Sequence, residues 1–78
     1  MSDELLLNTN ELLTQIKKIA KSEGINMTLL KYTINEIFNK KDGVRNLYNK
    51  FNRNTIRVSE LIEIAEVLNY EVVLRKKV

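Results

Sequence analysis

Residues 44–54 read VRNLYNKFNRN, and the predicted fold is organised around them. On a helical wheel at about 100° per residue, residues 44–53 separate into two sides. The apolar side holds Val44, Leu47, Tyr48 and Phe51. The polar side holds only side chains that suit base edges and phosphates: Arg45, Asn46, Asn49, Lys50 and Arg53. An ordinary surface helix exposed to solvent shows the same division. The surrounding sequence must therefore distinguish a helix that contacts nucleic acid from one that only faces solvent.

Positive charge is concentrated around this predicted helix. Residues 40–57 contain six Lys or Arg against one Asp, a formal charge of +5, whereas residues 1–39 and 58–78 each carry −1. A localised basic stretch on an otherwise balanced domain is typical of a protein that binds nucleic acid.

Composition narrows the class of protein. A chain of 78 residues with 44% hydrophobic and 29% charged side chains is expected to form one small soluble domain. The acidic start, with no signal-like apolar stretch after it, indicates a cytoplasmic protein. The absence of Cys and His removes disulfides, the usual zinc ligands and the commonest general base. We therefore expect no enzyme, no metal, no cofactor, no small-molecule ligand and no membrane partner.

A first helix is expected over residues 9–22. Asn8 suits the N-cap, and Glu11 three residues later matches a capping box. Gly24 can take the left-handed conformation that ends a helix. The side expected to be buried consists of apolar residues at helical spacing, with Leu13 beside them: Leu12, Ile16, Ile19 and Ala20.

A second helix is expected from residue 26 or 28 to about residue 40. Thr33 and Glu36 match another capping box, which leaves a start near Ile34 as the alternative. A turn at residues 41–43 follows, in which Gly43 permits a positive φ, and the two helices then form a helix-turn-helix layout. The buried stripe consists of Leu30, Ile34, Ile37 and Phe38.

The C-terminal part is expected to contain a loop over residues 54–57 and one more helix. Ser59 suits its N-cap and Asn69 its C-terminal cap, with Leu61, Ile64, Ala65 and Leu68 buried. Residues 70–75, YEVVLR, are typical of a short strand. Such a strand is either an extended tail or pairs with a second copy of the chain through Tyr70, Val72, Val73 and Leu74.

The predicted fold is therefore a mainly α domain of four to five helices with a short C-terminal β-strand. Residues 1–8 form a lead-in, residues 9–69 the helix-turn-helix domain, and residues 70–78 a strand or tail that could serve dimerisation.

Residues 43–74 resemble the lambda-repressor-like helix-turn-helix family, the Cro/repressor or xenobiotic-response-element type of regulator in bacteria and phages. The resemblance rests on NLYNKFNRNT at 46–55 and LIEIAEVLNYEV at 61–72. The second segment matches the family pattern Leu-x-x-Ile-Ala-x-x-Leu-Gly, with Asn69 in place of Gly. Between Gly24 and Asn46 the chain is about six residues longer than usual in the family, so the placement of the second helix on DNA stays open.

The resemblance implies that the 44–53 helix enters the major groove of double-stranded DNA. Base contacts would come from Arg45, which suits guanine, and from Asn46 and Asn49, which suit adenine. Tyr48 either packs with its hydroxyl outward or contacts a phosphate. The full set expected at phosphates is Lys40, Lys41, Tyr48, Lys50, Arg53, Asn54, Thr55 and Arg57.

These observations predict a sequence-specific DNA-binding transcriptional regulator. It would act as a repressor and bind as a homodimer to an inverted repeat, as compact phage- or plasmid-type repressors do. The alternative is a protein-interaction module with the same fold, such as an inhibitor, an antitoxin or a partner of another nucleic-acid machine. Its basic stretch would then meet an acidic protein surface.

Overall fold

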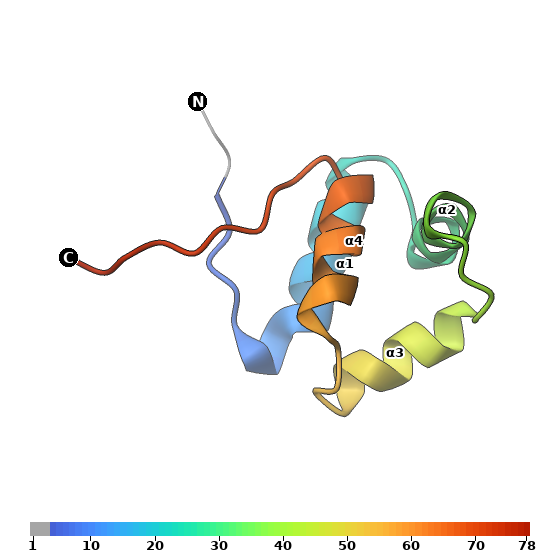
Figure 1. Ribbon diagram of the computed structural model, residues 1–78, viewed down its shortest axis with the longest axis horizontal. Coiled ribbons are helices and arrows are strands. Elements are labelled where there is room, and N and C mark those ends of the chain that lie inside the picture. The colour runs from blue at the N-terminus through green and yellow to red at the C-terminus, as the bar shows by residue number, and fades with distance from the viewer. Residues whose placement is uncertain (1–3) are drawn as a thin grey trace.

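The structure is a computed structural model that describes residues 4–78 (Figure 1). Residues 1–3, the start of the predicted lead-in, lie outside the described part. A short 3-10 helix precedes four α-helices: η1 (Thr9–Glu11), α1 (Leu12–Ser22), α2 (Met27–Phe38), α3 (Val44–Asn52) and α4 (Val58–Val67). The prediction of a mainly α fold with four to five helices is confirmed.

The start of the first helix differs from the predicted capping box. The Asn8 side chain accepts a hydrogen bond from the Asn10 N–H at 3.0 Å, which caps η1, and α1 begins only at Leu12. The Asn8 N–H donates to Gln15 Oε1 at 2.9 Å, so Gln15 takes the role expected of Glu11. The 3-10 turn explains the difference, because it adds a tighter turn between the cap and the α-helix. Gly24 has φ +77° and ends α1 as predicted.

The second helix is continuous. Asn26 is its N-cap and accepts the Leu29 N–H at 2.8 Å, while the Thr33 hydroxyl donates back to the Leu29 carbonyl at 2.9 Å. A start near Ile34 is therefore excluded. The expectation for Gly43 was wrong: Asn39 takes the left-handed conformation at φ 55°, and Gly43 is an extended N-cap of α3 at φ −98°. Asn can end a helix in this way because it tolerates positive φ better than most residues.

The last helix begins earlier than predicted. Arg57 is the N-cap of α4, and Ser59 lies inside the helix. The Glu60 carboxylate accepts the Arg57 N–H at 3.0 Å, so the third residue of the helix reaches back to satisfy the cap backbone. Asn69 ends this helix region at φ 63°, as expected.

The predicted strand over residues 70–75 is not formed, and residues 4–78 contain no β-strand. The Tyr70 N–H donates to the Ala65 carbonyl at 2.8 Å, which completes the end of α4, and the chain then continues as an extended tail. A strand needs a neighbour to accept its hydrogen bonds, and the described part of the chain offers none to this segment. Arg75 instead forms a two-point contact with the Glu4 carboxylate, with atoms 2.6 and 3.1 Å apart, so the tail lies beside the N-terminal segment.

The four α-helices share one core. Helix α2 packs against α3 and α4, and α1 packs against α2 and α3. Ile37 was expected in the core but is 59% exposed, because α2 turns this residue beyond the edge of its buried stripe. Met27 is buried although the periodicity did not indicate it. The core side chains are Ile16, Ala20, Met27, Leu30, Ile34, Leu47, Phe51, Ile64 and Leu68.

Helix α3 lies at one edge of the molecule. In Figure 1, α2 is seen nearly end-on whereas α3 runs in the plane of the view, so the two helices cross at a steep angle. The C-terminal tail lies on the opposite side from α3. Within residues 4–78, no helix has the length and apolar content needed to cross a bilayer.

Candidate nucleic-acid interface

Helix α3 divides into a buried side and an exposed side. Leu47 and Phe51 are 4% and 5% exposed and pack into the core. Arg45, Asn46 and Asn49 all lie on the exposed side. The predicted separation of the two sides is confirmed, and the three side chains expected to read bases are not covered by the described part of the chain.

The beginning of α3 is fastened to α2 by a charged contact. The Lys31 ammonium lies 2.9 Å from Asp42 Oδ1, and the Lys31 side chain is only 8% exposed. Asn46 donates its side-chain N–H to Asp42 Oδ2 at 2.8 Å, and Asn35 donates to the Asp42 carbonyl at 2.7 Å. One loop residue thus joins the second helix to the first turn of α3.

This arrangement holds the Asp42 carboxylate in its charged form. The hydrogen bond from Lys31 outweighs the opposing effect of burial, and the Asn46 amide adds to it, so the pKa of Asp42 falls from 3.8 to about 2. Asp42 also lies near the N-terminus of α3, where the helix dipole favours a negative charge.

The three candidate base-reading residues differ in their surroundings. Arg45 and Asn49 form no side-chain hydrogen bond or ion pair with any residue in the range 4–78. Asn46 is held by Asp42 through its N–H group and keeps its side-chain oxygen available. A contact between Asn46 and an adenine would therefore compete with Asp42, whereas contacts from Arg45 and Asn49 would not.

Two lysines of the predicted phosphate set are paired inside the protein. Lys50 contacts Glu60 at 2.5 Å, and Lys40 contacts Glu63 at 3.0 Å. Both carboxylates belong to α4 and are largely shielded, at 14% and 19% side-chain exposure. Burial raises the pKa of Glu60. Hydrogen bonds from Lys50 and from the Arg57 N–H together lower it by more, so the pKa of Glu60 falls below its usual value. Their role at phosphates stays a prediction, but the structure adds a feature that the sequence did not indicate: α4 supplies each of these two lysines with a carboxylate.

The remaining members of the phosphate set behave differently. Tyr48 is half-buried beside the core, with the Lys17 ammonium 5.1 Å from the centre of its ring, an arrangement typical of a cation–π contact. The packing interpretation of Tyr48 thus accounts for its position. The other members lie exposed along α3, its C-terminal end and the adjoining loops: Lys41, Arg53, Asn54, Thr55 and Arg57.

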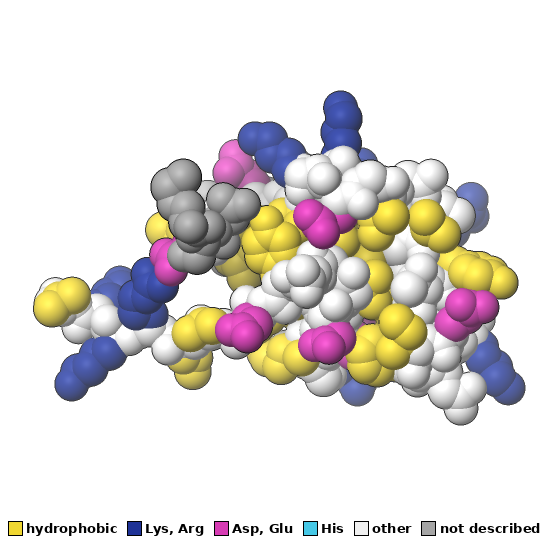
Figure 2. Space-filling model, turned by 90° about the horizontal axis from the view of Figure 1, so that it is seen from above, with side chains coloured by type: hydrophobic (Ala, Val, Ile, Leu, Met, Phe, Trp, Pro, Cys, Tyr) yellow, Lys and Arg dark blue, Asp and Glu magenta, His cyan; other side chains and the backbone are white. Residues whose placement is uncertain are grey.

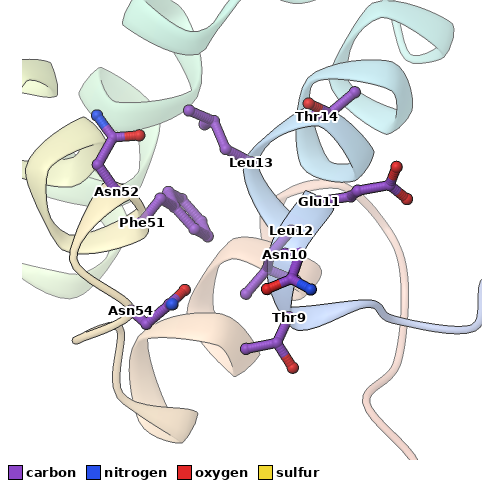
Figure 3. A pocket seen from close by; sticks show the side chains of 9 residues that line it. All are labelled: Thr9, Asn10, Glu11, Leu12, Leu13, Thr14, Phe51, Asn52 and Asn54. Atoms are coloured by element: carbon purple, nitrogen blue, oxygen red, sulfur yellow. The ribbon is translucent and has the colours of Figure 1, made fainter.

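A pocket of about 260 Å³ lies between the start of the first helix and the end of α3 (Figure 3). Phe51 forms part of its wall, and the side chains of Asn10, Asn52 and Asn54 surround it. Among the described residues that line it, the only charged one is Glu11, which would repel a phosphate. The pocket therefore adds amide groups beside α3 but no cation. Asn52 was missed in the sequence prediction, although it lies next to Arg45 on the helical wheel.

The face of the molecule away from α3 has a different character. Figure 2 views the protein from the top of Figure 1: apolar and acidic side chains lie over the helices, and Lys and Arg side chains stand at the edges. Helix α2 contributes to the exposed apolar surface through Leu29, Tyr32 and Ile37, which are 46%, 62% and 59% exposed.

The carboxylate partners of Lys31, Lys40 and Lys50 were not predicted from the sequence. Lys31 lies about 60° from Ile34 on the wheel of α2, so its closeness to the buried stripe was a usable signal. Nothing in the spacing linked Lys50 to Glu60 or Lys40 to Glu63, because these pairs depend on how α4 packs.

Comparisons with protein-family models, with curated proteins and with solved structures found no match to this chain. Among the described residues, no three His, Cys, Asp or Glu side chains come together as a metal site would require. Function must therefore be inferred from the surface of α3 and the residues around it.

Proposed function

We propose that this protein is a sequence-specific double-stranded DNA-binding regulator that inserts α3 into the major groove. The observation that carries the proposal is the exposed polar side of α3, where Arg45 and Asn49 stand unpaired among the described residues on a helix anchored by Leu47 and Phe51. Arg suits the O6 and N7 acceptors of guanine, and Asn suits N6 and N7 of adenine.

The position of α3 supports this proposal. An α-helix fits the major groove, which is about 12 Å wide, only when the rest of the protein does not obstruct its approach. Helix α3 lies at the edge of the molecule and away from the C-terminal tail (Figure 1). Arg53 at its C-terminal end and Lys41 in the preceding loop flank the exposed side with positive charge suited to phosphates.

Helix α2 contributes little to this interface. Its exposed side carries Leu29, Tyr32, Glu36 and Ile37, a set without a cation. In the proposed complex, phosphate contacts therefore come from α3 and the loops at its two ends.

The proposal includes a homodimer on an inverted repeat. One helix contacts few base pairs, and two copies related by a two-fold axis would read major-groove faces about 34 Å apart. Repression would follow from occlusion of a promoter. The tail supplies apolar side chains that a second copy could cover, since Val72, Val73 and Leu74 are 42%, 67% and 100% exposed.

Deletion of residues 71–78 tests the tail as the dimer contact, because it leaves Tyr70 packed on the core. Sedimentation of the full chain and the shortened chain should show a loss of mass of the assembly on deletion. An unchanged dimer would place the interface elsewhere.

The experiment that tests the function is selection of bound duplexes from a random pool. Enrichment of one motif with two-fold symmetry supports the proposal. The Arg45→Ala variant should then bind the recovered motif less tightly while its affinity for random duplex changes little.

The alternative is a protein-interaction module, and the exposed apolar residues of α2 favour it. Leu29, Tyr32 and Ile37 lie within roughly 140° of the helical wheel, a width that suits a partner helix. Selection that recovers no motif, together with weak binding to any duplex, would favour this alternative.

A further inference from the structure

Three ion pairs surround one small cavity between α2, α3 and α4. The pairs are Lys31 with Asp42, Lys40 with Glu63, and Lys50 with Glu60. All six side chains line the same cavity of about 40 Å³, together with Ile34, Leu47 and Ile64. The cluster carries no net formal charge, although half of it comes from the most basic part of the sequence.

The pairs differ in how accessible their lysines are. The Lys31 side chain is 8% exposed, whereas those of Lys40 and Lys50 are 36% and 31% exposed. Lys31 is therefore a structural cation. The ammonium groups of Lys40 and Lys50 are near enough to solvent to exchange one oxyanion partner for another by rotation of their side chains.

We propose that Glu60 and Glu63 compete with DNA phosphates for Lys50 and Lys40, and so lower the affinity of the protein for DNA. This inference rests on the proposed function, since it concerns the same surface of α3. Carboxylate and phosphodiester oxygens both carry negative charge and both accept charge-assisted hydrogen bonds from a lysine ammonium. A carboxylate already in contact must be displaced before a phosphate can take its place.

The position of Lys50 makes this competition direct. On the wheel of α3 it lies at the edge of the polar side, about 60° from Arg53 and 40° from Asn46. The side chain therefore starts on the DNA-facing border of the helix and bends toward α4 to reach Glu60. Without that carboxylate, the same stem could extend along the exposed side toward a phosphate.

The salt dependence of DNA binding measures this effect. The logarithm of the affinity falls as the logarithm of the salt concentration increases, and we use 'salt slope' for the steepness of this fall. Each phosphate neutralised by a lysine adds about 0.9 to the salt slope. One freed lysine should therefore increase the ratio of affinities at 50 and 200 mM salt about 3.5-fold. Glu60→Gln and Glu63→Gln each remove one competing charge, and the amide oxygen introduced by Glu60→Gln can still accept the Arg57 N–H that caps α4.

Glu66→Gln is the matched control. Glu66 lies on the exposed side of α4 and forms no ion pair within the described part of the chain, yet its replacement changes the net charge equally. Binding of all variants is measured by fluorescence anisotropy with a labelled random duplex of about 20 base pairs. We expect the salt slope to rise for Glu60→Gln and Glu63→Gln, to rise further in the double variant, and to rise less in the control.

Addition of Lys50→Gln to the Glu60→Gln protein should abolish the rise in the salt slope, because the freed ammonium is then gone. Glu63 takes no part in capping α4, so its variant keeps the test decisive if the Glu60 variant does not fold. Slopes for Glu60→Gln and Glu63→Gln equal to that of Glu66→Gln would overturn the inference while leaving the proposed function intact. Failure of the unaltered protein to bind any duplex would instead refute the proposed function.

Discussion

Replacement of Asp42 by Asn tests whether one carboxylate fastens the second helix to α3. In the structure this carboxylate contacts the buried Lys31 ammonium at 2.9 Å and accepts the Asn46 amide at 2.8 Å. Asn has the same shape but no charge, so the substitution removes the ion pair and leaves the geometry of the loop largely intact. Lys31 is then left buried without a counter-charge.

The expected loss of folding free energy in Asp42→Asn follows from the pKa of Asp42. A pKa that falls from 3.8 in the unfolded chain to about 2 in the folded protein corresponds to about 2.4 kcal/mol of folding free energy. The Asp42 side chain is 31% exposed, so solvent screening reduces this value, and we expect a loss of about 2 kcal/mol at neutral pH. For a small domain this is a large part of the total stability.

The lowered pKa of Asp42 also determines how its contribution to stability depends on pH. Because folding lowers the pKa, the contribution of Asp42 is complete above about pH 4 and is lost as the pH falls toward about 2. The stability difference between the unaltered protein and Asp42→Asn should therefore shrink from about 2 kcal/mol toward zero across that interval.

Urea unfolding followed by circular dichroism at several pH values measures this difference. Glu36→Gln, an exposed carboxylate on α2, serves as the control and should change stability little. In the Lys31→Met/Asp42→Asn double variant the buried charge is gone, so stability should be partly or wholly restored. Parallel stability curves for the unaltered protein and Asp42→Asn between pH 2 and 5 would show that the charge of Asp42 does not stabilise the fold.

Four further substitutions test the core, a turn and the proposed interface. Leu30→Ala should cost about 2–5 kcal/mol in urea unfolding, because Leu30 is fully buried, and a loss below about 1 kcal/mol would contradict its place in the core. Gly24→Ala should cost about 1 kcal/mol from its φ of +77° alone, since nothing obstructs the added methyl group, and unchanged stability would argue against the left-handed turn. Arg45→Ala should cost about 1–3 kcal/mol on a selected DNA site, and equal losses on random duplex would argue against base reading. Arg53→Ala should weaken binding to all duplexes and lower the salt slope by about one, and an unaltered slope would remove Arg53 from the phosphate contacts.

The helices of this fold were predictable from local pattern. The spacing of Leu47 and Phe51 placed the buried side of α3, and the same periodicity found Ile16, Leu30 and Ile64. Such patterns are readable because a helix places residues three and four apart on one side, whatever it packs against.

Details that depend on competing local interactions were less predictable. Ser59 and Arg57 could both precede a helix, and the reach of the Glu60 side chain to the Arg57 N–H gave the earlier start. Asn39 and Gly43 could both break a helix, and Asn39 took the left-handed position. The strand at residues 70–75 needed a partner that local sequence does not supply.

Residue order along single elements was enough to predict four helices, most of the buried stripe of each, and a basic polar side on the helix that begins at Val44. Which cations of that basic stretch lack a carboxylate partner depends instead on how the elements pack together. The packing of α4 against α2 sets carboxylates beside Lys40 and Lys50, and the loop before α3 sets Asp42 against Lys31. Ion pairs form between groups that folding brings within a few ångströms, and their distance along the chain carries no record of that approach.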